Sequence, residues 1–198
     1  MLRPGLTIYF IRHGETDWNA VQRYQGQTDI PLNAKGRGQA ARNGQVLGEH
    51  RGQQRTRTID YVASPLARAS ETMQIVRAEM GLPADTFRRD DRLKEQHYGH
   101  WEGQLWGDLP RTDPEGFAAR ERDKWRWQPR DGESYAMLSA RIDGWLSEVM
   151  ADCVVASHGA VSRVLRGLVA PMNVKELAEL SVPQDKVMIV RKGSIDWL

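Results

Sequence analysis

Four short runs of β-branched and aromatic residues stand out in the hydrophobic pattern of the chain. They cover residues 6–11, 59–64, 153–157 and 187–190. Continuous apolar runs of this length are typical of strands that are buried on both faces of a parallel sheet. Because longer segments with helical spacing separate the runs, we expect strands and helices to alternate. The pattern therefore predicts an α/β fold, a three-layer α/β/α sandwich around a mostly parallel sheet.

The best-marked helix follows the second of these runs. Ser64 can cap its N-terminus and Pro65 can take the first helical position. Gly81, with Pro83 beyond it, provides the signal that ends the helix. Further helices are expected over residues 36–50, 135–150, 160–169 and 174–180. Glycines within the first of these segments lower its helix propensity.

One stretch departs from the alternation of strand and helix. Residues 90–132 are polar, carry tryptophans and are interrupted by prolines at positions 110, 114 and 129. We expect this stretch to lie over the sheet as an insertion. A chain of 198 residues is long enough to bury one core, so residues 1–198 are predicted to form a single domain, with the insertion at about 90–132. The last residues predict an antiparallel hairpin at the sheet edge that turns at Lys192 and Gly193.

Composition and charge exclude several classes of protein. The net charge is +2, and basic residues are interspersed with acidic ones, so nucleic acid is not an expected partner. Arg51, Arg55 and Arg57 form a local basic group, which we interpret as a solvated turn. No run approaches the roughly 20 apolar residues of a membrane span, and the N-terminus lacks the pattern of a signal peptide. Cys153 is the single cysteine and is interpreted as a core residue, so we expect a cytoplasmic protein without a membrane partner.

Candidate chemistry gathers where the predicted strands end. Arg12 and His13 follow the first strand, and His158 follows the run 153–157. Open α/β sheets form their ligand crevice at the carboxyl ends of the strands, so both histidines are expected at one edge. Each histidine alone is as easily structural as functional, whereas the pair is more informative. Arg68, in the first turn of the best-marked helix, would join Arg12 in a fork for a tetrahedral dianion.

The two arginines also bear on the protonation of His13. Nearby positive charge disfavours an imidazolium, and a neutral imidazole can attack phosphorus. Transfer of a phosphoryl group also requires a proton for the departing oxygen. Glu95 and Glu102 are the candidate acids in the segment 93–103, and their spacing does not choose between them. For either carboxylate, a solvated surface position is the alternative interpretation.

Five motifs together resemble the histidine phosphatase superfamily, which includes cofactor-dependent phosphoglycerate mutases and many small phosphatases. They are RHGETDWN at 12–19, RYQGQTDIPLN at 23–33, SPLARASET at 64–72, LKEQHYGHWEG at 93–103 and SHGAVSR at 157–163. The resemblance implies a nucleophile, His13, that passes through a phosphohistidine, and it selects Glu95 over Glu102 as the proton donor. It also implies that substrate phosphate is held by a set of four residues: Arg12, Asn19, Arg68 and His158. The implied substrate is a small-molecule phosphate ester, no metal or other cofactor is implied, and His158 would be protonated when phosphate is bound.

The same resemblance bears on whether the chain is a phosphatase or a mutase. Mutases of this family typically place an arginine directly after the acid glutamate and a lysine eleven residues after it, where this chain has Gln96 and Trp106. Neither residue is a cation that could bind the carboxylate of phosphoglycerate, which favours a phosphatase, although Arg120 or Arg122 could supply replacement charge. A phosphoglycerate mutase remains the alternative, and a non-catalytic module that binds phosphorylated ligands is a second one.

Further features leave more than one interpretation open. The tryptophans of the insertion, at positions 101, 106, 125 and 127, either form an aromatic wall over the crevice or pack in the core. His97 and His100 do not make a metal site, because no third ligand lies at a usual spacing. The chain is expected to be a monomer or a homodimer.

Overall fold

The four predicted strands all lie in one sheet. The computed structural model describes residues 2–52, 59–170 and 172–198. Within these ranges six strands pair in the order β3-β2-β4-β1-β5-β6. The strands are β1 (Ile8–Arg12), β2 (Asp60–Ala63), β3 (Arg88–Arg89), β4 (Cys153–Ser157), β5 (Val187–Arg191) and β6 (Ser194–Trp197). The pairs β1–β4, β2–β4 and β2–β3 are parallel, whereas β1–β5 and β5–β6 are antiparallel, so the predicted mostly parallel sheet is confirmed.

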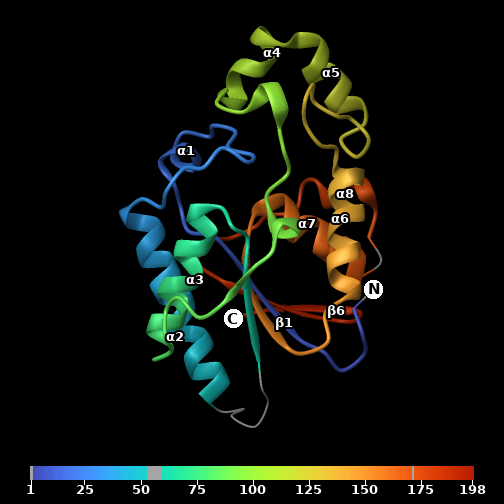
Figure 1. Cartoon of the computed structure of the whole chain (residues 1–198). Coiled ribbons are helices and arrows are strands. Elements are labelled where there is room, and N and C mark those ends of the chain that lie inside the picture. The colour runs from blue at the N-terminus through green and yellow to red at the C-terminus, as the bar shows by residue number, and fades with distance from the viewer. Residues whose placement is uncertain (1, 53–58, 171) are drawn as a thin grey trace.

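Helices cover both faces of this sheet and complete the predicted three layers (Figure 1). Their bounds are α1 (Asp17–Ala20), α2 (Ala34–Gly52), α3 (Ala67–Glu79), α6 (Tyr135–Ser147), α7 (Gly159–Val169) and α8 (Val174–Leu177). Alternate strand residues supply the two cores, because successive side chains of a strand point to opposite faces. In β1, Ile8 and Phe10 belong to the core with α6 and α7, whereas Tyr9 and Ile11 belong to the core with α2 and α3. The core helices thus anchor both sides of the sheet.

The start of α3 differs from the sequence-based prediction. The helix begins at Ala67, two residues beyond Pro65, and its N-cap residue makes no side-chain capping bond. Ser64 does not cap the helix, because its Oγ instead accepts from the amide of Leu66 and bonds to the ring of His158. The amide of Ala67 donates to Asp29 Oδ1 over 2.8 Å. A residue distant in sequence therefore does the capping that was assigned to Ser64.

Other helix bounds differ by smaller amounts. The first predicted helix is longer than expected, since α2 runs from Ala34 to Gly52 despite its internal glycines. The helices predicted over residues 135–150 and 174–180 end early, at Ser147 and Leu177.

Two glycines allow the loop after β1 to lie against α2. A Cβ built on Gly14 would lie 2.1 Å from the carbonyl oxygen of Gly36, and one on Gly36 would lie 2.1 Å from the carbonyl oxygen of Glu15. Farther along α2, a Cβ on Gly44 would lie 2.7 Å from Glu79 Cβ. Of the glycines in α2, Gly36 and Gly44 are therefore points of close approach, whereas Gly38 faces open space. This packing places the RHGET segment at the carboxyl end of the sheet.

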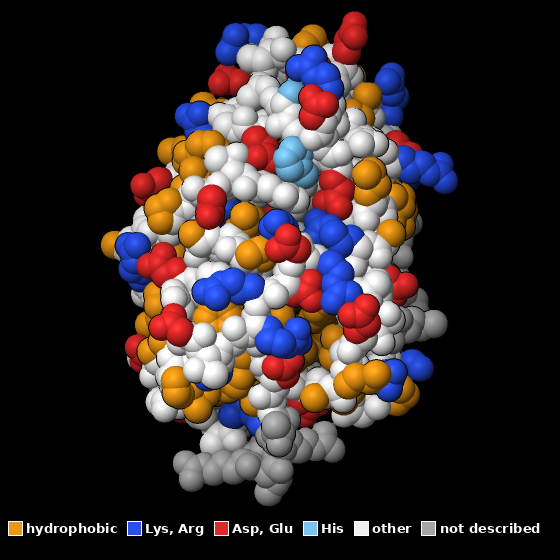
Figure 2. Space-filling view, viewed as in Figure 1, with side chains coloured by type: hydrophobic (Ala, Val, Ile, Leu, Met, Phe, Trp, Pro, Cys, Tyr) orange, Lys and Arg blue, Asp and Glu red, His pale blue; other side chains and the backbone are white. Residues whose placement is uncertain are grey.

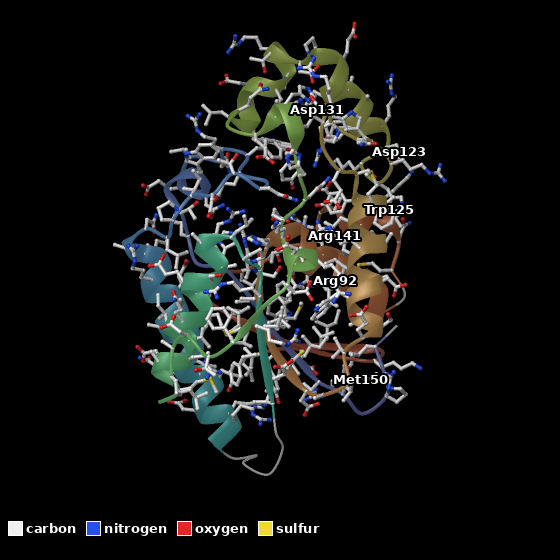
Figure 3. The ribbon with its side chains drawn as sticks, viewed as in Figure 1. Arg92, Asp123, Trp125, Asp131, Arg141 and Met150 are labelled. Atoms are coloured by element: carbon white, nitrogen blue, oxygen red, sulfur yellow. The ribbon has the colours of Figure 1, made fainter. Side chains whose placement is uncertain are left out.

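The segment 90–132 contains no strand and lies above the carboxyl ends of the sheet strands, as Figure 1 shows. It holds short helices: η1 (Asp91–Leu93), η2 (Gly99–Trp101), η3 (Trp106–Asp108), α4 (Leu109–Thr112) and α5 (Pro114–Arg122). Its tryptophans take both of the roles considered. Trp101 is fully buried and its ring lies 4.2 Å from that of Trp127, whereas Trp125, labelled in Figure 3, stacks on Tyr135 of α6. Trp106 alone among them lines an open hollow over the crevice.

The remaining structural expectations concern the surface and the C-terminal strands. The predicted hairpin is confirmed: β5 and β6 are joined at Lys192 and Gly193, where Gly193 has φ +82°, and they form one edge of the sheet. Cys153 is buried and unpaired, as expected. On the face shown in Figure 2, basic and acidic side chains are interspersed. None of the helices in the described ranges is long and apolar enough to cross a membrane, and Arg55 and Arg57 lie outside the described residues.

Candidate active site

The candidate site lies at the carboxyl ends of two neighbouring parallel strands that are followed by helices on opposite faces of the sheet. After β1 the chain passes to α2 on one face, and after β4 it passes to α7 on the other. Such a switch point opens a crevice at the carboxyl ends of the strands. A hollow of about 160 Å³ lies here. Among its lining residues are Arg12, His13, Asn19, Arg68 and Glu95.

The ring of His13 is held in one tautomer. Its Nδ1 lies 2.7 Å from the carbonyl oxygen of Gly14, an acceptor that requires a proton on Nδ1. On the other side, Arg68 Nε–H donates to His13 Nε2 over 3.3 Å, so Nε2 carries the lone pair. Burial, followed by the charges of Arg68 and Arg12, holds the pKa of His13 well below its usual value. The imidazole is therefore neutral, with Nε2 as its nucleophilic nitrogen.

Two buried guanidinium groups face this hollow without a carboxylate partner in the described part of the chain. Arg68 is fully buried, and its terminal nitrogens donate to the carbonyl oxygens of Gly26 and Thr28. Arg12 donates from one terminal nitrogen to the carbonyl oxygen of Val182, and its Nε is buried with no hydrogen-bond partner in the part of the chain that the structure describes. Burial lowers the pKa of both groups, yet arginine stays protonated at physiological pH. The positive charge at this point is thus left for an anionic ligand to neutralise.

His158 lies directly behind His13. The two ring centroids are 5.1 Å apart with the rings edge to face, and His158 is fully buried. Its Nε2 lies 2.8 Å from Ser64 Oγ, while its Nδ1 has no hydrogen-bond partner among the described residues. Burial, then the charge of Arg68, holds the pKa of His158 well below its usual value, so the ring is neutral. It is not among the residues that line the hollow, and its protonation by a bound phosphate stays a prediction.

Asn19 contributes from the short helix α1. Its Oδ1 accepts from the amide and hydroxyl of Thr16, which closes a capping box, and also from Gln184 Nε2. Gln184 donates to the carbonyl oxygen of His13 as well. Because the amide oxygen of Asn19 is occupied, its Nδ2 group is the part available to an anion. Gln184 gave no signal in the sequence, since it lies in a polar loop far along the chain.

The structure separates the two candidate acids. Glu95 lines the hollow, and its carboxylate accepts from the amides of Gln96 and Ala160, the latter in the first turn of α7. Arg141 of α6, labelled in Figure 3, holds the preceding backbone by donating to the carbonyl oxygens of Arg92, Lys94 and Glu95. The carboxyl group of Glu95, the candidate proton donor, is therefore held on a backbone that Arg141 fixes in place.

Glu102 lies away from the hollow, under the loop that carries Gly26. Its carboxylate accepts from the amides of Gln27, Thr28 and Tyr98 and from the hydroxyl of Thr28, over 2.7–3.1 Å. That loop in turn supplies the carbonyl oxygens that hold Arg68. Glu102 thus fixes the loop that positions Arg68.

The histidines of the insertion do not form a metal site in the described ranges. No group of three or more His, Cys, Asp or Glu residues suited to a metal occurs there. His100 Nε2 lies 3.0 Å from Asp113, whose carboxylate also accepts from Trp101 and caps α5. His97 lies 3.9 Å from Glu102. Both histidines therefore belong to the internal contacts of the insertion.

Comparison with known proteins assigns the class that this fold and this site define. The chain belongs to the histidine phosphatase superfamily, branch 1, whose family model matches residues 8–197. It is 33% identical over 144 residues to a glucosyl-3-phosphoglycerate phosphatase of Mycobacterium tuberculosis, covering 73% of this chain and 60% of that protein. It is 30% identical over 164 residues to a metal-independent phosphoserine phosphatase of Arabidopsis thaliana, covering 80% of this chain and 66% of that protein. The chain thus matches less than two thirds of the length of either relative.

A solved structure extends the likeness over the whole fold. A mycobacterial glucosyl-3-phosphoglycerate phosphatase in complex with VO3 matches with a TM-score of 0.79 and 27% identity. The match covers 98% of this chain and 97% of that one.

Proposed function

We propose that the chain is a metal-independent phosphomonoester hydrolase that acts on a small phosphorylated metabolite through a phosphohistidine at His13. The observation that carries the proposal is the state of His13: its ring is neutral, its Nδ1 donates to the Gly14 carbonyl oxygen, and its unprotonated Nε2 lies beside the guanidinium of Arg68. A nucleophile needs an unprotonated lone pair, and a phosphate dianion needs positive charge around it. Family membership supports the same chemistry.

The first half of the reaction transfers the phosphoryl group to His13. Arg12 and Arg68 bind the equatorial oxygens, and Asn19 Nδ2 and His158 complete the phosphate-binding set. Nε2 of His13 attacks phosphorus in line, the bond from phosphorus to the ester oxygen breaks, and Glu95 gives its proton to the departing oxygen. Fixed guanidinium groups stabilise the charge that develops on the transferring group.

The second half returns the enzyme to its starting state. Water takes the place of the departed alcohol beside Glu95, which is now a carboxylate and accepts a proton from it. The water oxygen bonds to phosphorus, the bond from phosphorus to His13 Nε2 breaks, and inorganic phosphate leaves. Each step uses side chains alone, and no metal ion or other cofactor enters it.

Hydrolysis is favoured over isomerisation by the residues near Glu95. Gln96 is buried and donates to the carbonyl oxygen of Glu133, and Trp106 carries no charge. Neither position offers the cation that the mutase pattern needs. A non-catalytic binding module is disfavoured because the nucleophile, the acid and both arginines are present.

We further propose that residues 1–198 act as one domain with the insertion covering the site, and that the protein is cytoplasmic.

The proposal is tested with p-nitrophenyl phosphate and the full chain. His13→Ala is expected to abolish release of p-nitrophenol, and His50→Ala, which changes a histidine in the last turn of α2, should leave it unaffected. With an alkyl phosphate, Glu95→Gln should lower turnover by roughly 10²- to 10⁴-fold. Vanadate should inhibit, and EDTA should not.

The intermediate is detected by intact-protein mass spectrometry after an alkaline quench, because phosphohistidine is labile to acid. p-Nitrophenol leaves with little help from an acid, so Glu95→Gln should accumulate the phosphoenzyme and His13→Ala should show none. Retained turnover in His13→Ala would refute the mechanism. Loss of activity on chelation would show a metal-dependent enzyme instead.

A further inference from the structure

A second, larger hollow adjoins the one that contains His13. It has a volume of about 330 Å³, and Trp106, Arg120 and Tyr135 are among its lining residues. The two hollows share a wall made by Arg23, Tyr24, Tyr98 and Arg163. A phosphate bound at His13 would therefore direct the rest of its ester past this shared wall.

Arg163 lies on this wall without a compensating carboxylate in the described ranges. It stands one turn into α7, where Nε donates to the carbonyl oxygen of Leu180 and a terminal nitrogen lies 3.5 Å from the hydroxyl of Tyr135. Both acceptors are neutral. The guanidinium is half-buried, and its charge is among the causes that lower the pKa of Arg12, after burial. Arg163 is thus a cation at the site that makes no ion pair with the described residues.

Arg23 is a second cation of this kind. One of its terminal nitrogens donates to the carbonyl oxygen of Gly103, its guanidinium lies 5.5 Å from the ring of Trp18, and no carboxylate of the described residues pairs with it. The outer cations differ. Arg120 pairs with Glu121 while stacking on Trp106, and Lys124 pairs with Glu121 and Glu179. Uncompensated charge is therefore concentrated at the shared wall, beside the phosphate hollow.

The balance of charge indicates what the wall binds. Arg12, Arg23, Arg68 and Arg163 line the inner hollow, where Glu95 is the one acidic residue. A phosphate dianion matches the charge of two guanidinium groups, and Arg12 and Arg68 lie on either side of His13. An ionised Glu95 offsets one of the other two charges, so one positive charge in this half-buried space is still left for a second anion. A planar guanidinium fork suits a carboxylate or a phosphate, and such pairing is strong where water is excluded.

We propose that the leaving group of the substrate carries a second anionic group, a carboxylate or a phosphate, which Arg163 and Arg23 bind at the shared wall. The inference rests on the proposed phosphatase function and adds the substrate class. These two cations come from α7 and from the loop after α1, and so from positions other than Gln96 and Trp106, where the mutase pattern has its cations. The aromatic side chains of Tyr24 and Trp106, whose rings lie 5.5 Å apart, would line the path of the remaining part of the leaving group.

The test compares matched substrates that differ in one anionic group. 3-Phosphoglycerate and glycerol 3-phosphate share a three-carbon skeleton, and fructose 1,6-bisphosphate and fructose 6-phosphate differ by a phosphate. We expect the wild-type chain to prefer the member with the extra anion in at least one pair by roughly 10- to 100-fold in kcat/KM, the range of a charge-assisted hydrogen bond. The pair that shows the preference identifies the group as carboxylate or phosphate.

Arg163→Gln should collapse this preference by at least roughly tenfold, and Arg163→Lys should retain part of it. Arg23→Gln changes a different element and should reduce the same ratio, so the test does not depend on one variant folding. Arg122→Gln removes the same charge from an exposed position outside both hollows and should leave the ratio within about twofold. A wild-type ratio near one for both pairs, or a large ratio that survives both arginine substitutions, would overturn the proposal.

Binding measurements separate this inference from the proposed function. Calorimetry on the full chain with His13→Ala compares the affinities for the same substrate pairs without turnover. Turnover of p-nitrophenyl phosphate by the wild-type chain with no preference in binding or kcat/KM would refute only the anion subsite. The opposite outcome is also distinguishable. If the wild-type chain hydrolysed none of the esters, while His13→Ala bound the member with the extra anion more tightly and the double variant with Arg163→Gln did not, the phosphatase would be refuted and the subsite supported.

Discussion

Substitution of Glu102 by glutamine tests whether the loop under the site sets the position of Arg68. One carboxylate oxygen accepts from the amides of Gln27 and Tyr98, and the other accepts from the amide and hydroxyl of Thr28. Glutamine keeps one acceptor oxygen and turns an NH2 group toward two donors. The change therefore removes two charge-assisted bonds and opposes donors to donors.

The magnitude follows from these contacts. Two charge-assisted hydrogen bonds at about 1.5 kcal/mol each give a loss of about 3 kcal/mol in the free energy of unfolding. For a chain of 198 residues this corresponds to a fall of roughly 6–12 °C in Tm. Because the loop carbonyls of Gly26 and Thr28 hold Arg68, a displacement of about 1 Å there should lower kcat/KM by roughly 10- to 100-fold.

Calorimetry gives the Tm, and p-nitrophenyl phosphate turnover well below the Tm gives kcat/KM. The inhibition constant of vanadate should rise in parallel, since a displaced Arg68 binds the oxyanion less well. Glu148→Gln is the matched control, because this exposed carboxylate makes only a surface ion pair with Arg92 and should change the Tm little. A Glu102→Gln protein with the wild-type Tm and wild-type vanadate inhibition would refute the reasoning.

Two further predictions concern stability. His13 and His158 have folded pKa values well below 6.5, so the unfolded chain binds protons that the folded chain does not as the pH falls below 6.5. The free energy of unfolding should therefore be greatest above pH 6.5 and fall from there toward pH 5, which calorimetry at stepped pH measures; a smaller fall is expected in His13→Asn, and a flat Tm across that range would contradict the assignment. Gly44→Ala should lower the free energy of unfolding by about 1–3 kcal/mol, because its Cβ would lie 2.7 Å from Glu79 Cβ. Gly38→Ala in the same helix faces open space and should stabilise by roughly 0.5–1 kcal/mol in urea unfolding; equal effects of the two substitutions would show that helix propensity, not packing, decides.

The strands formed by the apolar runs were predictable because their signal is local, whereas the two-residue strand β3 (Arg88–Arg89) was not predicted. A continuous apolar run needs two covered faces wherever it lies, so the runs at 6–11 and 153–157 predict central strands before any partner is known. The same runs place Arg12, His13 and His158 at their carboxyl ends, which lie together in any parallel pairing of the two strands. The C-terminal hairpin was equally readable, because Gly193 supplies the positive φ of its turn.

The use of each polar side chain depended on contacts between distant segments. Ser64 looks like a helix cap in sequence, yet its hydroxyl bonds to His158, and Asp29 accepts from the first helical amide instead. Spacing could not separate Glu95 from Glu102, because the difference lies in which backbone amides each carboxylate meets. Local propensity likewise undervalued Gly36 and Gly44 of α2, which let neighbouring segments approach closely.

The sequence alone determined the class of fold, the strands that carry the candidate chemistry and the presence of a histidine able to act beside arginines. Those properties depend on hydrophobic periodicity and residue type, which are local. The tertiary structure decided which nitrogen of His13 is unprotonated, which glutamate lines the hollow and which arginines lack a carboxylate partner among the described residues. These depend on distances between residues far apart in the chain, because a tautomer, a burial or an unbalanced charge exists only once the surrounding groups are in place.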